Sequence, residues 1–151
     1  MKRVVRVFVV FVAVTSALRA AGAWVARRFE AGAGKADADE VRLAAIWGGR
    51  DLRSRAGALR SVSARTVFGG LNLDLTGATV DPAGATITLD VRLGGINLEL
   101  PAGVRAEVED RLQGGQVALA LQDPAELPED APPVKVIVEG FGAGVNIESR
   151  R

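Results

Sequence analysis

Glu107, Glu109 and Asp110 are the residues of this chain best placed for acid–base chemistry, because they lie close together in the sequence. Two carboxyl groups can cleave a glycosidic bond, one as the acid and the other as the base or nucleophile. Neighbours on a strand point to opposite faces, however, so solvated surface charge explains these residues better than a catalytic pair. The chain has no cysteine and no histidine, which removes thiol nucleophiles, thiolate and imidazole metal sites, and every Ser–His or Cys–His pair. The sequence therefore predicts a protein that is not an enzyme and has no cofactor.

Two columns of polar residues recur at similar spacing and could bind a ligand. They are Asn72, Asn97 and Asn146 in one column and Asp74, Glu99 and Glu148 in the other. Amide and carboxylate oxygens are ligands for hard divalent cations. Asparagines in register also hydrogen-bond along a stack, and a solvated polar face is the simpler interpretation. We expect an interaction surface here and no metal site.

A cluster of arginines is the second candidate surface. It comprises Arg50, Arg53, Arg55, Arg60 and Arg65. These side chains could meet anionic lipid headgroups, or they could form the polar cap that the terminal unit of a repeat array requires. The sequence leaves both interpretations open.

A recurring seven-residue phrase contains the polar columns and predicts the architecture. Clear copies are GGLNLDL at Gly69–Leu75, GGINLEL at Gly94–Leu100 and AGVNIES at Ala143–Ser149, and degenerate copies are GGRDLRS at Gly48–Ser54 and GGQVALA at Gly114–Ala120. The starts are 21, 25, 20 and 29 residues apart. Repeats of this period indicate stacked units that bury their apolar faces against neighbours.

The phrase alternates with period two, as in a half-buried strand. Leu71, Leu73 and Leu75 share one face, and further strands are expected at Ser63–Val67, Ala85–Leu93, Val104–Val108 and Val134–Val138. The paired glycines are expected at the bends, where positive φ or close backbone approach excludes a Cβ. The large residues before them (Trp47, Phe68, Leu93 and Phe141) are expected to fill the interior. We predict a mainly β protein, a short β-solenoid (β-helix-like) of about five coils stacked in chain order, preceded by one N-terminal α-helix. In that order the fourth copy separates the acidic residues of the third and fifth.

The N-terminal segment is apolar enough to interact with a membrane. Val7–Ala26 contains 20 residues with one charge, Arg19, which is about the length of a membrane-spanning helix. We predict an anchor within residues 1–30, a linker at 31–40 and the repeat domain at 41–151, in a single-pass protein of the cell membrane. A secretory signal cleaved near Ala21-Gly22-Ala23, giving a secreted protein, and a helix lying on the membrane surface are the alternatives.

Charge is distributed unevenly along the chain. Residues 1–35 carry seven basic groups and one acidic group, for +6, and the remainder carries 12 basic and 17 acidic groups, for −5. Binding to a phosphate backbone needs clustered Lys and Arg. The acidic repeat domain therefore predicts no nucleic-acid partner.

The phrase FGGLNLDL and the later LGGINLELPAGVRAEVE resemble the C-terminal domain of LiaF-type cell-wall-active-antibiotic response proteins. The resemblance covers residues 41–148 and includes the turn Leu100-Pro101-Ala102-Gly103. It implies a compact β-solenoid-like domain in a membrane protein that modulates a sensor kinase responding to envelope stress. The chain departs from that family in having at most one predicted membrane helix.

Two functions are compatible with the sequence. We expect a non-enzymatic, membrane-tethered interaction or regulatory module of the bacterial cell envelope, whose partner is a sensor kinase or another envelope component. The alternative is a structural scaffold that assembles end to end, because stacked coils expose open strand edges. Pro101 and Pro124 argue against long polymers.

Overall fold

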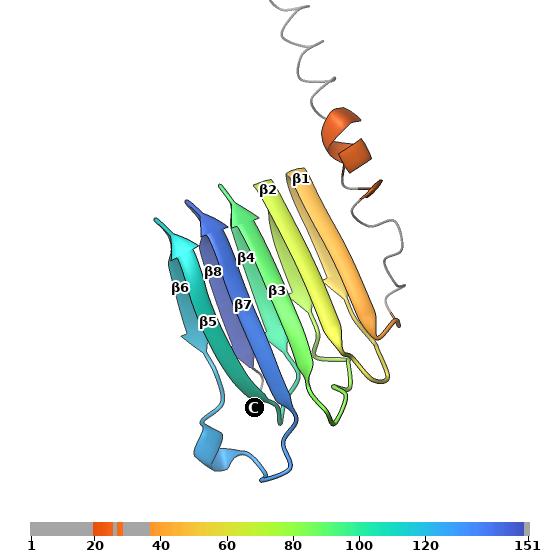
Figure 1. Ribbon diagram of the computed structural model, residues 1–151, viewed down its shortest axis with the longest axis vertical. Coiled ribbons are helices and arrows are strands. Elements are labelled where there is room, and N and C mark those ends of the chain that lie inside the picture. The colour runs from red at the N-terminus through yellow and green to blue at the C-terminus, as the bar shows by residue number, and fades with distance from the viewer. Residues whose placement is uncertain (1–19, 26, 29–36, 150–151) are drawn as a thin grey trace, which may run out of the picture.

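The computed structural model describes residues 20–25, 27, 28 and 37–149, and the chain is mainly β (Figure 1). The strands and one short 3-10 helix are β1 (Glu40–Arg53), β2 (Ser61–Asp74), β3 (Ala85–Arg92), β4 (Gly95–Leu100), β5 (Arg105–Gln113), β6 (Gln116–Ala120), η1 (Pro124–Glu126), β7 (Pro133–Phe141) and β8 (Gly144–Ser149). Residues 20–25, 27 and 28 are helical. In this described part no helix has the length and apolarity to span a bilayer. Most of the predicted anchor, residues 7–19, lies outside the described residues.

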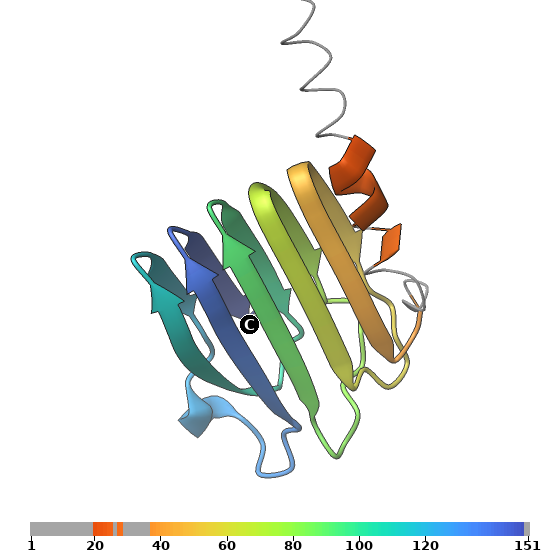
Figure 2. The same ribbon diagram turned by 45° about the horizontal axis from the view of Figure 1, so that its top comes forward.

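Each copy of the repeat forms one bent unit of the structure, and all pairing between units is parallel. Unit 1 is β1, unit 2 is β2, unit 3 is β3 with β4, unit 4 is β5 with β6, and unit 5 is β7 with β8. The first half of every unit lies in one layer and the second half in another, with the bends at one end (Figure 2). The predicted adjacent register of the five phrases is confirmed, for example by Gly70 opposite Gly95 and Gly95 opposite Gly144. Parallel stacking of this kind is typical of solenoids.

The predicted stacking in chain order is wrong for the last two units. Strand β3 pairs with β7, and β7 pairs with β5, while β4 pairs with β8, and β8 pairs with β6. The spatial order is therefore units 1, 2, 3, 5 and 4, and the C-terminal unit lies inside the stack.

Apolarity explains why unit 4 lies at the end. Its inward positions include Ala106 and the charged Asp110, where unit 5 has Val134 and Val138. An end unit has a neighbour on one side only, so the unit with the least apolar surface loses least there. The sequence signal was present, because the phrase of unit 4 is degenerate.

The core lies between the two layers and consists mainly of Leu, Ile and Val. The alternation predicted from the phrase is confirmed, because the inward residues Leu71, Leu73, Ile96, Leu98 and Ile147 are at most 1% exposed. The expected strands between the phrases are also present in β2, β3, β5 and β7.

The prediction that large residues before the glycines fill the interior is wrong. Trp47, Phe68, Leu93 and Phe141 are between 43% and 48% exposed. The first three have φ values of 57°, 52° and 53°, so the bend places positive φ on a large residue. In units 5 and 4 the register gives this position to Gly142 and Gly114, both with φ of 61°.

The glycine after the bend residue is required by close backbone approach instead. A Cβ on Gly69 would lie 2.1 Å from the carbonyl oxygen of Gly48, and one on Gly94 would lie 2.0 Å from that of Gly69. Positive φ and close backbone approach, both expected of the glycine pair, therefore occur at two different residues. The large residue adopts the left-handed conformation and points outward, and the glycine lets the units approach.

A buried hydroxyl in the core leads to a stability prediction. Thr66 is fully buried on β2, and its Oγ1 has no hydrogen-bond partner. Because an unsatisfied buried polar group costs about 1–3 kcal/mol, Thr66→Val is expected to raise the free energy of unfolding by about 1 kcal/mol. Urea unfolding with an unchanged m value would measure this.

Ser54→Ala provides the matched control, because the Ser54 hydroxyl is equally buried and accepts a 3.3 Å hydrogen bond from the Ala56 backbone N–H. This variant is expected to lower the stability. A lower urea midpoint for Thr66→Val would show that its hydroxyl is satisfied in solution.

Candidate functional site

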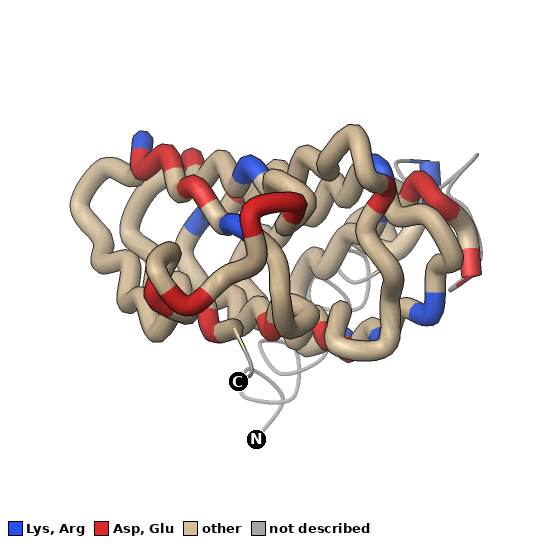
Figure 3. The backbone as a smooth tube through the Cα atoms, turned by 90° about the horizontal axis from the view of Figure 1, so that it is seen from below, with Lys and Arg blue, Asp and Glu red and all other residues tan. Residues whose placement is uncertain are grey.

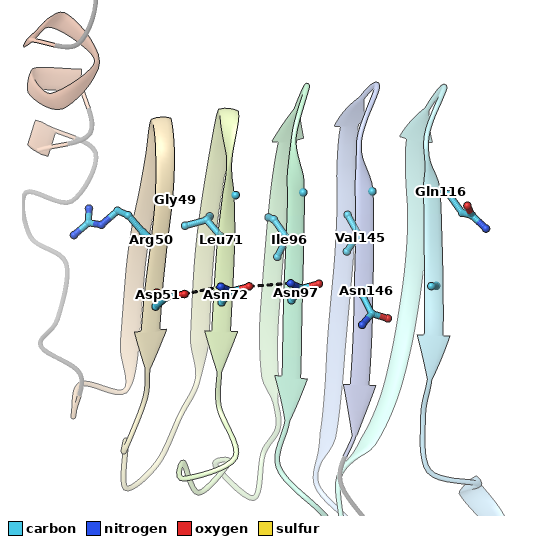
Figure 4. A pocket seen from close by; sticks show the side chains of 14 residues that line it. Gly49, Arg50, Asp51, Leu71, Asn72, Ile96, Asn97, Gln116, Val145 and Asn146 are labelled. Carbon is cyan, nitrogen blue, oxygen red and sulfur yellow. Dashed lines mark hydrogen bonds between the residues drawn. The ribbon is translucent and has the colours of Figure 1, made fainter.

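The outer surface of the second layer carries the polar columns that the sequence singled out (Figure 4). We call this surface the asparagine face. One row is Asp51, Asn72, Asn97 and Asn146, and the next is Asp74, Glu99 and Glu148. The structure thus brings six of the predicted site residues together. A groove of about 620 Å³ crosses the strands here.

The floor of the groove is a row of glycines in register, namely Gly49, Gly70, Gly95 and Gly144. Packing does not require them. A Cβ on Gly70 would be 3.9 Å from the nearest atom, the carbonyl oxygen of Gly95, and a Cβ on Gly144 would have no atom within 4 Å. The bare floor therefore keeps the groove open rather than letting the units approach.

The predicted asparagine ladder is present over part of the stack. Asn97 Nδ2 donates to Asn72 Oδ1 at 2.8 Å, and Asn72 Nδ2 donates to Asp51 Oδ1 at 2.5 Å. Asn146 is in register with Asn97, but its Nδ2 donates instead to Glu148 Oε1 at 2.7 Å. The ladder therefore joins units 1 to 3 and does not extend to unit 5.

The acidic row is continuous, and unit 4 does not separate its members as predicted. Glu99 lies in register between Asp74 and Glu148, because unit 5 is the neighbour of unit 3. Like charges opposite one another destabilise a sheet, and hydrogen bonds offset this at Asp74. Thr76 donates to the Asp74 carboxylate through its backbone N–H (3.0 Å) and its hydroxyl (2.5 Å), and Arg53 donates at 2.6 Å.

These contacts change the acidity of Asp74. The hydrogen bonds from Thr76 and then the contacts with Arg53 lower the pKa of Asp74, although partial desolvation opposes them. Within the described residues, no group of three or more Asp, Glu, His or Cys side chains could hold a metal ion.

The five arginines do not form one patch. Arg53, Arg60 and Arg65 each form an ion pair with the next unit, to Asp74 (2.6 Å), Asp81 (3.0 Å) and Asp90 (2.8 Å). Arg50 lies at an inward position of unit 1 and donates to the carbonyl of Ala44 at 3.2 Å, and Arg55 lies in the loop after β1. Exposed pairs contribute little, about 0–1 kcal/mol each, so their main effect is to link units in register.

The carboxylates considered for acid–base chemistry lie on β5. The register places Glu107 and Glu109 on the outer face and Asp110 at an inward position opposite Val138. Arg111 and then Lys135 lower the pKa of Glu109 by hydrogen bonds. A general acid needs a raised pKa, so Glu109 is ionised at neutral pH and does not suit that role.

The sequence did not indicate the bends as a functional surface. Trp47, Phe68 and Leu93 are exposed there in a conformation that costs an ordinary residue about 1–2 kcal/mol. Strain of this kind occurs at functional sites. The signal in the sequence was the large residue before each glycine pair, which we assigned to the core.

Comparisons with protein families, curated proteins and solved structures find no match to this chain.

The acidic residues that link the units predict a loss of stability in acid. The pKa of Asp74 is lowered by Thr76 and Arg53, and that of Asp81 is lowered by the backbone N–H of Ala83 and by Arg60. A group whose pKa is lower in the folded state stabilises that state fully above the unfolded pKa, about 3.9 for Asp. The contribution is lost as the pH falls through the folded pKa. Urea midpoints should therefore fall between about pH 5 and pH 2.

Asp74→Asn is the variant that isolates one contribution. It is expected to be less stable than the parent at neutral pH and to lose less stability on acidification. Identical slopes of stability against pH for the two proteins would show that Asp74 has the same pKa in both states.

Proposed function

We propose that this chain is a non-enzymatic, membrane-tethered interaction module of the bacterial cell envelope, built as a short β-solenoid of five coils. The open glycine floor of the asparagine face is the observation that carries the proposal, because Gly70 could accept a side chain without a packing cost. The apolar N-terminal segment in the sequence supports a tether. The resemblance to LiaF-type proteins favours a sensor kinase or another envelope component as the partner.

The groove suits an extended partner segment. Amide and carboxylate groups repeat along it at the strand spacing of about 4.8 Å. The bare backbone beside them allows close approach, and the row next to the floor supplies hydrogen-bond donors and acceptors such as Asn97 and Asn146. Recognition by such a surface positions a partner and does not require a reaction.

The test fills the groove without disturbing the core. Full-length chain carrying Gly70→Thr is cross-linked in native membranes, and the proteins recovered are compared with those of the parent. We expect an envelope partner to be recovered with the parent and lost with the variant. The control is Ser63→Thr, on the outer face of the other layer and in register with Thr88.

Recovery of the same partner with Gly70→Thr would exclude the asparagine face as its site. Failure to recover any partner with the parent would contradict the proposed function. A topology reporter fused after Arg151, with a check for cleavage, distinguishes a cytoplasmic kinase partner from an external one and an anchor from a signal.

Self-assembly is the second candidate, and the open end at unit 4 favours it. Within the described part of the chain, strands β5 and β6 pair only with β7 and β8, and Leu119 on β6 is 54% exposed. Unpaired edges of this kind add strands. A monomeric profile for the full chain in sedimentation would exclude it.

A further inference from the structure

The bends of all five units lie together at one end of the molecule, next to the helical residues 20–25, 27 and 28 (Figure 2). Large apolar side chains are exposed at this end. We call Trp47, Phe68, Leu93 and Phe141 the bend ridge, and Trp24 and Val25 of the helix are exposed beside it. Among the described residues, the remaining exposed large apolar side chain is Leu119. The exposed apolar surface is thus concentrated at one end.

Members of the bend ridge contact a neighbouring unit at two places. The rings of Trp47 and Phe68 are stacked, with centroids 4.9 Å apart and an interplanar angle of 17°. A Cβ on Gly142 would lie 2.8 Å from Leu93 Cδ2, so the Leu93 side chain extends over unit 5, next to Phe141. The helix approaches the other end of the ridge, because a Cβ on Gly22 would lie 3.4 Å from Trp47 Cδ1.

The fold does not require large residues at these positions. Trp47, Phe68 and Leu93 have positive φ, which a bulky residue adopts only with strain. Gly142 and Gly114 make the same bend in units 5 and 4. If these positions served the bend alone, glycine would be favoured at Trp47, Phe68 and Leu93 as well. We therefore infer that the exposed side chains serve a contact outside the fold.

The bend end and the opposite end of the molecule also differ in charge. The five bends, residues 46–50, 67–71, 92–96, 112–116 and 140–144, contain Arg50 and Arg92 and no carboxylate. The loops at the opposite end, residues 54–60, 75–84, 101–104 and 121–132, have two basic and five acidic residues, for −3 (Figure 3). The basic residues are Arg55 and Arg60, and the acidic ones are Asp81, Asp123, Glu126, Glu129 and Asp130. An anionic surface would therefore attract the bend end and repel the other.

The helical residues that precede the body in the sequence lie at the bend end (Figure 1). Residues 7–18, which precede the helix, are uncharged and apolar, and Arg27 and Arg28 follow. The Arg28 guanidinium lies 4.8 Å from the centroid of the Trp24 ring. Aromatic residues flanked by arginines are typical of the membrane–water interface.

We propose that the bend ridge seats the body on an anionic lipid bilayer, with the aromatic side chains at the boundary between headgroups and acyl chains. This inference rests on the proposed function, which supplies the tether. It adds an orientation of the body on the membrane. The bends face the lipid and the acidic loops face away from it. The asparagine face is then perpendicular to the membrane plane and accessible to a partner from the side.

Quenching of tryptophan fluorescence by brominated lipids tests the proposal. The chain has two tryptophans, so Trp24→Phe with Trp47→Phe gives a background into which single probes are placed. Phe141→Trp reports the end of the ridge farthest from the helix, and Leu119→Trp is the control, because Leu119 is similarly exposed but lies off the ridge. Full-length chains are reconstituted in phosphatidylglycerol vesicles carrying bromines on the acyl chains.

The Phe141→Trp probe is expected to lose about half its emission, because interfacial side chains reach about 5–10 Å into the headgroup–acyl boundary. Leu119→Trp is expected to lose none. Weaker quenching in phosphatidylcholine vesicles would support the role of charge. Circular dichroism checks that each variant keeps its β structure.

The outcomes separate this inference from the proposed function. The chains could float with the vesicles while the Phe141→Trp and Leu119→Trp probes are equally unquenched. That result would support attachment through the N-terminal segment and contradict contact of the bend ridge with the bilayer. If the chains do not float, the tether fails and the seating fails with it. Blue-shifted emission from Phe141→Trp without vesicles, together with a dimeric mass, would assign the ridge to a second copy and overturn the proposal.

Discussion

Gly69→Ala is expected to destabilise the protein by about 4 kcal/mol or more, which is at the extreme of single substitutions. The added Cβ would lie 2.1 Å from the Gly48 carbonyl oxygen and 3.2 Å from the Gly48 carbonyl carbon. Backbone atoms cannot rotate away as a flexible side chain can. Units 1 and 2 would have to separate, which would break the pairing of β1 with β2. The free energy of unfolding from urea titration measures the effect.

Gly70→Ala is the matched control for Gly69→Ala, one residue along the same strand. Its Cβ would be 3.9 Å from the nearest atom, so this variant is expected to stay within about 1 kcal/mol of the parent. Unit 5 has Ala143 where unit 2 has Gly69, and the residue before it is Gly142. The double variant Phe68→Gly/Gly69→Ala copies that pair and should recover part of the lost stability. Equal stability of Gly69→Ala and Gly70→Ala would contradict the close approach.

Deleting unit 5 is expected to disrupt the fold, whereas deleting unit 4 is expected to be tolerated. Strands β5 and β6 find their partners in β7 and β8, which also cover β3 and β4. Truncation before Pro133 therefore removes the neighbour of unit 4 and uncovers unit 3 at once. Hydrogen exchange should show loss of protection across β5 and β6, with partial loss in β3.

The control deletes residues 101–132 and joins β4 to β7 with a ten-residue flexible linker, the length of the natural connection 75–84 between β2 and β3. Units 1, 2, 3 and 5 keep their mutual pairing in this variant, so cooperative unfolding should persist. Stacking in chain order predicts the opposite result, in which deletion of unit 5 is tolerated and deletion of unit 4 disrupts the fold. Protected β5 amides in the truncated chain would show that unit 4 can take the place of unit 5.

The repeat and its alternation sufficed to predict which residues face the core. Leu71, Leu98 and Ile147 are buried because the period-two pattern reports local backbone geometry. The order of units could not be obtained in this way. Every unit presents a similar apolar face to its neighbours, so local patterns fit several orders, and the choice depends on comparing the apolar content of unit 4 with that of unit 5.

Only part of the candidate site could be predicted, because register follows from the repeat but the order of units does not. The columns through Asn72 and Asp74 follow from register, and they lie together on one face. The register pairing of Glu99 with Glu148 of unit 5 was missed, because it depends on the order of units. The bend residues were misplaced because hydrophobicity suggests burial, whereas a left-handed residue such as Phe68 turns its side chain outward.

The inserted C-terminal unit also affects how this chain is made. Residues 105–120 leave the ribosome before residues 133–149 but acquire their neighbours only from them. The nascent chain therefore leaves the strands of unit 3 unpaired on one side until residues 133–149 have been made. A ribosome that stops before Pro133 would release a protein with unpaired edges on both layers, a natural substrate for chaperones and proteases.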